Sequence, residues 1–102
     1  MTDETRAVLL AAADLLEPEG AWCQDQMALD ARGKPTIASS PNACRWCASG
    51  AIIAVSVRKL QARLNARVAI RESLGVASLT EWNDAPERTQ DEVVAALRAA
   101  AA

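Results

Sequence analysis

The sequence contains no histidine, no tyrosine and no phenylalanine among its 102 residues. Without an imidazole, no Ser–His–Asp triad or Cys–His pair can take and return a proton near neutral pH. Zinc sites of the Cys₂His₂ and His₃ types are excluded for the same reason. We therefore expect a protein that is not an enzyme and that needs no cofactor.

Long apolar runs are also missing. The longest, residues 51–57, is interrupted by Ser56 and falls far short of the roughly 18 residues that a membrane span needs. The first residues are polar and acidic, unlike the basic start of a secretory signal peptide. Three cysteines, an odd number, favour free thiols over a disulfide framework. Together these features predict a cytoplasmic protein with no membrane contact.

The length bounds the architecture. A chain of 102 residues is enough for one domain, residues 1–102, and too short for two. Its 24% of charged residues is ordinary for a globular protein and argues against disorder. Because the chain has no other aromatic residue, we expect its three tryptophans to supply much of the bulk of the core.

The net charge of −2 conceals a segregation along the chain. Residues 1–30 carry seven acidic side chains and one basic one. Residues 31–75 carry eight basic side chains and one acidic one, and residues 76–102 carry five acidic and two basic ones. Such a pattern predicts that the middle segment packs beside the acidic ends, or else presents a basic face to a partner.

Periodicity and capping residues predict a mainly α domain of about four helices. The first helix starts after Thr2, a good N-cap, and ends before Pro18. A short element over residues 78–82 leads into a turn over residues 83–86. Thr89 and Glu92 form a capping box that opens the last helix.

Residues 21–37 are ambiguous. Asp30-Ala31-Arg32-Gly33 is typical of a tight turn in which glycine supplies a positive φ. A short β-hairpin or an extended loop between the first and second helices fits this composition. Met27-Ala28-Leu29 is equally compatible with one helical turn.

A long helical pattern follows from Ser39-Ser40-Pro41-Asn42, since proline suits the first turn of a helix. Gly75 is a good C-terminal residue for it, whether residues 47–74 form one helix or two broken near Asn65. Apolar residues spaced by three and four predict a buried stripe consisting of Ile53, Val57, Leu60, Leu64 and Val68.

Cys44-Arg45-Trp46-Cys47 is a CxxC motif at the predicted start of that helix. A helix N-terminus and a neighbouring arginine lower the pKa of a thiol, which suits a redox dithiol or a lone cysteine nucleophile. A metal site that uses Cys23, Cys44 and Cys47 is a further alternative, although a fourth cysteine or a histidine is lacking. We favour the simplest interpretation, in which Cys47 is a small buried hydrophobic residue.

Four basic residues at intervals of four form a stripe if the helix is continuous: Lys59, Arg63, Arg67 and Arg71. Such a stripe could contact successive phosphates. The acidic net charge and the lack of interleaved aromatics disfavour nucleic acid, so a solvated or internally paired face is the preferred interpretation. An acidic protein partner is the remaining alternative.

The segment from Trp82 to Thr89 concentrates unusual residues. Structurally, we expect a tryptophan plug followed by a turn in which Arg88 pairs with Asp84. Functionally, the same residues could form a rim that binds a peptide or a small ligand, since tryptophan and arginine are frequent anchors.

The chain resembles a family of small uncharacterised proteins from bacteria and their phages that is classed as a domain of unknown function. Three blocks carry the resemblance: Trp22-Cys23-Gln24 with Asp30 and Gly33, then Arg45-Trp46-Cys47-Ala48-Ser49-Gly50-Ala51, then Trp82 to Val93. It implies a bacterial or prophage context and brings no activity with it. Cys47 matches the pattern, whereas Cys44 lies outside it.

Three hypotheses follow. The first is a non-enzymatic protein-interaction or regulatory module, such as a phage-encoded inhibitor of a host system. Its partner, an unknown protein, would be held around Trp46, Trp82, Asp84 and Arg88. The second is a metal- or thiol-dependent site at Cys47 with Asp84 as accessory carboxylate. The third is nucleic-acid binding through the basic stripe.

Overall fold

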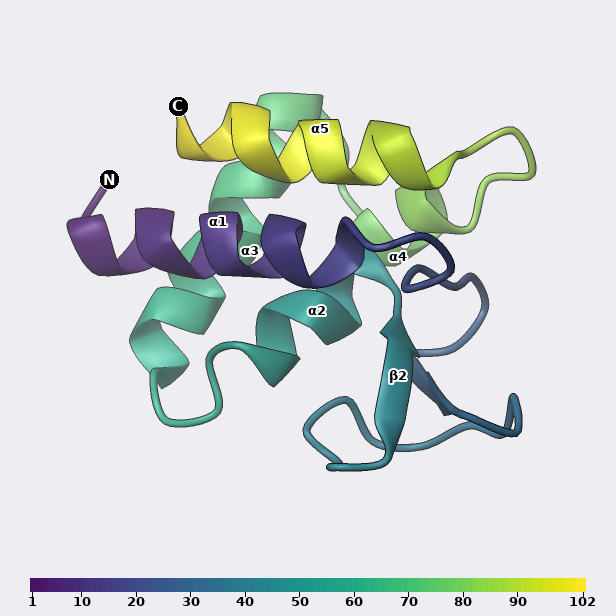
Figure 1. Cartoon of the computed structure of the whole chain (residues 1–102). Helices are drawn as coiled ribbons and strands as arrows, with labels where there is room; N and C mark the ends of the chain where they lie inside the picture. Colours follow the sequence, from purple (N-terminus) through teal and green to yellow (C-terminus); the bar gives the residue numbers. More distant parts are fainter.

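A computed structural model describes all residues from 1 to 102. The elements in chain order are α1 (Asp3–Leu16), β1 (Ala28–Asp30), β2 (Ala43–Trp46), α2 (Ala48–Ala54), α3 (Leu60–Leu74), α4 (Leu79–Asn83) and α5 (Gln90–Ala101), as Figure 1 shows. The predicted mainly α domain with a strand pair between its first two helices is therefore confirmed, with five helices.

Side-chain caps define three of the helix starts. The Thr2 hydroxyl accepts the Thr5 amide of α1, and the Ser78 hydroxyl accepts the Glu81 amide of α4. At α5, Thr89 and Glu92 form both halves of a capping box. These starts lie where the sequence predicts them, because a cap depends on residues close together in the chain.

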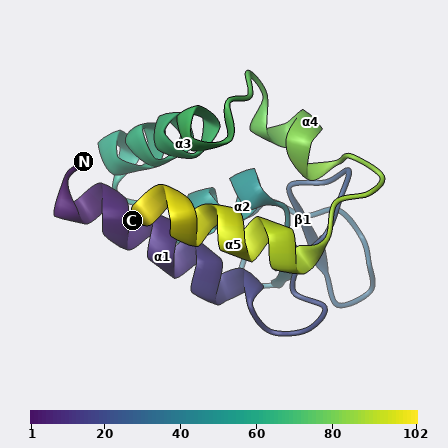
Figure 2. The same ribbon diagram turned by 90° about the horizontal axis from the view of Figure 1, so that it is seen from above.

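The core lies where α1 and α5 run side by side and α2 and α3 pack against them (Figure 2). Its largest fully buried apolar side chains are Leu9, Leu16, Ile52, Ile70, Val93 and Leu97. The three tryptophans are only partly buried and pack against the rim of this cluster. The expectation that they supply the bulk of the core is wrong, because many small alanines let the helices approach closely and leucine and isoleucine fill the space.

Residues 43–46 form β2, not the first turn of a helix. The pairing is antiparallel, with Ala28 opposite Trp46 and Leu29 opposite Arg45. A long-range strand partner therefore satisfies the backbone here, and α2 begins only after its N-cap, Cys47. The predicted helix start at Ser39–Asn42 is wrong for this reason.

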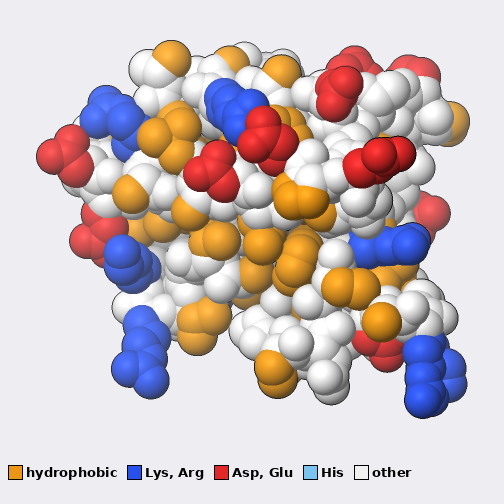
Figure 3. Space-filling model, viewed as in Figure 1, with side chains coloured by type: hydrophobic (Ala, Val, Ile, Leu, Met, Phe, Trp, Pro, Cys, Tyr) orange, Lys and Arg blue, Asp and Glu red, His pale blue; other side chains and the backbone are white.

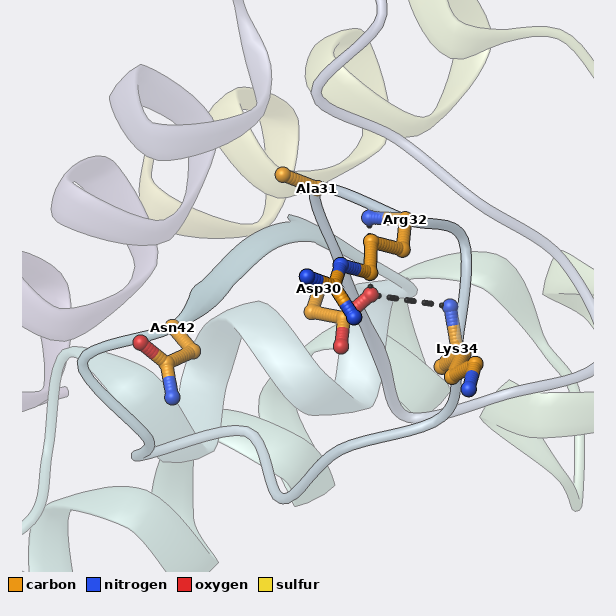
Figure 4. Close-up of a pocket in the computed structure, with 5 residues that line it drawn as sticks. All are labelled: Asp30, Ala31, Arg32, Lys34 and Asn42. Carbon is orange, nitrogen blue, oxygen red and sulfur yellow. Dashed lines mark hydrogen bonds between the residues drawn. The ribbon is translucent and has the colours of Figure 1, made fainter.

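The turn at Asp30–Gly33 is confirmed, with φ +75° at Gly33. One oxygen of the Asp30 carboxylate accepts the amides of Arg32 (2.8 Å) and Lys34 (3.0 Å), as the close-up of this shallow pocket shows (Figure 4). The local hairpin is reduced to a single bridge between Leu29 and Pro35. The alternative of a helical turn at Met27–Leu29 is wrong, because β2 recruits these residues into a strand.

Two helices, α2 and α3, occupy residues 47–74, and the break lies at residues 55–59, not near Asn65. The Ser56 hydroxyl donates back to the Ile52 carbonyl at this break. Gly75 ends α3 in the left-handed conformation (φ +70°), as predicted.

The predicted buried stripe is wrong for its α3 members. Leu60, Leu64 and Val68 are 62%, 46% and 41% exposed, and Val57 before the helix is 56% exposed. The buried side chains of α3 are instead Ala62, Ala66 and Ile70. At 100° per residue, these two stripes lie on nearly opposite sides of the helix.

Candidate functional site

Asn83, the last residue of α4, is fully buried and holds three chain segments together. Its Oδ1 accepts the Trp22 indole N–H (2.8 Å) and the Ala48 amide at the start of α2 (3.0 Å). Its Nδ2 donates to the Cys23 carbonyl (3.2 Å) and to the Asp84 carboxylate (2.9 Å). The sequence marked Asn83 only as a turn residue, since its partners lie 35 to 61 residues away.

Trp82 and Arg88 interact with each other. The Arg88 guanidinium lies 4.1 Å from the centroid of the Trp82 ring, and its Nε donates to the Trp82 carbonyl (2.9 Å). Arg88 pairs with Glu92 at 3.2 Å, and its side chain is only 15% exposed. The predicted Arg88–Asp84 pair is wrong, because Asp84 instead accepts the Asp25 amide (2.9 Å).

Trp46 lies on β2, and its indole N–H donates to the Ala38 carbonyl (3.0 Å). Like Trp82, Asp84 and Arg88, it is neither fully exposed nor fully buried. The polar groups of all four residues thus bond within the domain, which leaves them little free capacity for a partner.

The three cysteines occupy different environments. Cys44 is exposed on β2, whereas Cys23 and Cys47 are buried. Burial raises the pKa of the Cys47 thiol although the Gly50 and Ser49 amides oppose the shift, and burial with the charge of Cys47 raises the pKa of Cys23 to about 11. The predicted lowering of the Cys47 pKa is therefore wrong.

The Cys47 sulfur serves as N-cap of α2 and accepts the Gly50 amide at 3.2 Å. A Cβ on Gly50 would lie 1.9 Å from the Met27 carbonyl oxygen, so glycine is required at this close approach. A small hollow of about 180 Å³ opens beside Cys47, lined by Asp25, Gln26, Met27, Cys47, Thr80 and Asp84. No three histidine, cysteine or carboxylate side chains are grouped as a metal ion would require, so Cys44 is not brought to Cys23 and Cys47 for this purpose.

The outward side of α3 carries the largest set of exposed apolar residues. We define the outer face of α3 as the apolar residues Val57, Leu60, Leu64 and Val68 with the flanking Arg63, Arg67 and Arg71. No other helix or strand lies over this side of α3 (Figure 2). The sequence found these apolar residues by their spacing but assigned them to the core.

The bases of this face lack acidic partners. All four ion pairs of the domain involve residues 1–30 and 76–102, although α3 packs against α1 and α5. Arg63 donates to Ser56 through its Nε (3.2 Å), and the Arg67 Nε is buried with no hydrogen-bond partner. The predicted stripe is thus present over Arg63, Arg67 and Arg71, while Lys59 lies just before the helix as its N-cap.

Acidic side chains gather elsewhere. On the face seen in Figure 3, they lie mostly over α1, α5 and the loop before α5, while basic side chains project at the lower corners. The segregation of charge along the chain is therefore kept in space, with α3 as a basic element.

Comparison with known families gives one match. A family of unknown function (DUF6197) covers residues 1–102. The chain belongs to this family. No curated protein and no solved structure matches it.

Family membership supplies no activity, so the sites must be judged on their geometry. None of the five helices is long and apolar enough to cross a membrane. Two features remain with unused capacity for a ligand: the outer face of α3 and the hollow beside Cys47.

Proposed function

We propose that this protein is a non-enzymatic interaction module that binds an acidic amphipathic helix of a partner protein on the outer face of α3. A phage-encoded inhibitor of a host system would belong to this class. The observation that carries the proposal is a row of half-exposed leucine and valine side chains beside arginines that have no acidic partner.

The apolar row supplies affinity. Leu60, Leu64 and Val68 recur at intervals of four on a regular helix, which is the spacing that a second helix packs against. Complete burial of such a side chain is worth about 1.5–3 kcal/mol, so covering these half-exposed ones contributes on the order of 1 kcal/mol each. An apolar row of this kind on a surface marks an interaction site.

The arginines supply the sign of the partner. Arg63 and Arg67 lie between the core side of α3 and the apolar row, and Arg71 lies beside Leu64 and Val68. A partner helix with glutamate or aspartate flanking its own apolar stripe would meet them at this edge. Because Arg67 already holds a buried Nε without a partner, a carboxylate there would satisfy an unpaired donor.

Nucleic acid, through Lys59 and the three arginines, is the second candidate. A phosphate backbone would pair with the bases but leave the leucine row uncovered, and the chain as a whole carries a net charge of −2. We therefore favour the protein partner and treat nucleic acid as an alternative outcome of the test.

The test places a photo-crosslinking amino acid at position 64 and, as a matched control, at Leu10, an exposed leucine on the outer side of α1. A protein captured in bacterial cells from position 64 and not from position 10 is then purified. Its affinity is measured by calorimetry for the original protein, Leu64→Glu and Leu10→Glu. We expect Leu64→Glu to weaken binding at least 30-fold and Leu10→Glu less than threefold.

Equal affinities for the two variants would contradict the proposal, as would the absence of any protein captured from position 64. A second copy of this chain in the cross-link would also contradict it. Binding of a mixed-sequence oligonucleotide that falls steeply between 50 and 200 mM salt, and that is lost on changing Arg63, Arg67 and Arg71 to glutamine, would support the nucleic-acid alternative instead.

A further inference from the structure

Three sulfur-bearing residues occupy adjacent register positions in paired backbone segments. A parallel bridge joins Trp22 to Trp46, and antiparallel pairing joins Ala28 to Trp46. Cys47 follows Trp46, so its neighbours on the two sides are Cys23, after Trp22, and Met27, before Ala28. The Cys23 amide donates to the Trp46 carbonyl (3.0 Å) and the Cys47 amide to the Met27 carbonyl (3.2 Å).

The side chains meet as this register requires, since neighbours in register point to the same side of a sheet. The Cys47 Sγ lies 3.8 Å from the Met27 Sδ. The charge of Cys47 is the second-largest cause of the raised pKa of Cys23, which places the two thiols close together. Cys44, by contrast, is exposed.

We propose that Cys23, Cys47 and Met27 bind one copper(I) ion through two thiolates and one thioether. Soft sulfur ligands select copper(I), which accepts three of them, whereas zinc prefers four nitrogen or sulfur ligands. Binding forms two Cu–S(thiolate) bonds and one Cu–S(thioether) bond and releases two thiol protons. Neither the metal nor the sulfur changes oxidation state.

The surroundings suit a bound thiolate pair. The Gly50 amide already donates to the Cys47 sulfur at 3.2 Å, and such N–H···S bonds stabilise a metal-bound thiolate. Asp25 and Asp84 lie close enough to raise the pKa of Cys23, so their negative charge also attracts a cation. The 180 Å³ hollow lined by Met27 and Cys47 gives the ion a path from solvent. This site is independent of the outer face of α3.

The experiment titrates the reduced protein with copper(I) under anaerobic conditions against a colorimetric copper(I) chelator, with native mass spectrometry for stoichiometry. We expect one equivalent per chain, and affinity lower by at least 100-fold in Cys23→Ser and Cys47→Ser. Met27→Leu, which keeps the volume and removes the sulfur, should lose about tenfold. Cys44→Ser is the matched control and should bind like the original protein.

The variants should fold, because serine is itself a good N-cap at position 47 and Met27 is 38% exposed. Far-UV circular dichroism checks this for each variant. A loss of binding in Cys44→Ser with retention in Cys23→Ser would assign the ion to the CxxC pair and overturn the proposal. Unchanged affinity in Met27→Leu, or an original protein that binds no better than Cys23→Ser, would overturn it as well.

Discussion

Replacing Asn83 by alanine should destabilise the domain more than any other single change of a polar residue. The substitution removes the acceptor of the Trp22 indole N–H and of the Ala48 amide, and the donor to the Cys23 carbonyl. The position is fully buried, so these groups do not regain water easily. Each unsatisfied buried group costs about 1–3 kcal/mol.

Because the three losses share one site and are not additive, we expect a decrease of about 3–5 kcal/mol in the free energy of unfolding. That is a large part of the roughly 5–15 kcal/mol that holds a domain of this kind. Urea denaturation followed by tryptophan fluorescence and by far-UV circular dichroism measures the change. The matched control is Asn42→Ala, at an exposed asparagine, which should stay within about 0.5 kcal/mol.

Asn83→Asp separates the acceptor role from the donor role. A carboxylate still accepts from Trp22 and Ala48, but it cannot donate to Cys23 and it repels Asp84. We expect Asn83→Asp to be less stable than the original protein at pH 7 and to recover part of the loss at lower pH, when one carboxyl of the pair takes up a proton. If Asn83→Ala lost less than 1 kcal/mol, the idea that this residue joins the three segments would be refuted.

Three further outcomes are expected. Gly50→Ala should cost about 1–3 kcal/mol in urea denaturation, because its Cβ would meet the Met27 carbonyl oxygen at 1.9 Å and force the backbone apart. Ala66→Leu should cost a similar amount by overpacking the core side of α3, whereas Leu64→Ala should change stability by less than about 0.5 kcal/mol; the reverse order would put the wrong side of α3 outward. Cys23, with its pKa raised to about 11, holds its proton more tightly when folded, so its contribution is fully present below pH 9 and is lost as pH rises from 9 to 11. Cys23→Ser should flatten that alkaline loss in a pH series of thermal melts, and an equally steep loss in the variant would assign the effect elsewhere.

The features that the sequence predicted correctly depend on neighbours along the chain. The caps at Thr2 and Thr89 and the left-handed glycine at position 75 are each decided within a few residues. The strand at residues 43–46 is decided by partners near residues 22 and 28, which no local pattern reveals. A proline and an asparagine in the right order imitated a helix start there.

The same limit explains what was missed at the candidate sites. Asn83 is surrounded in sequence by residues typical of turns, and its role depends on Trp22 and Ala48, which are distant in the chain. The CxxC spacing drew attention to Cys44, although the register of the strands places Cys47 beside Met27 instead. A spacing of three in sequence brings two thiols together on a helix, but not across the end of a strand.

The orientation of α3 is the most informative of these differences, because its sequence offers two apolar stripes and only packing can choose between them. The leucine stripe is the more hydrophobic, yet the domain buries Ala62, Ala66 and Ile70. Small residues let α3 approach α1 and α5, whose own facing side chains include many alanines; leucines in their place would hold the helices apart. The larger side chains are thereby left outside, where they add nothing to the stability of the isolated domain. An outward leucine row beside unpaired arginines is accounted for by a surface that becomes buried only when a partner binds, which is why the outer face of α3 carries the proposed function and the tryptophan segment does not.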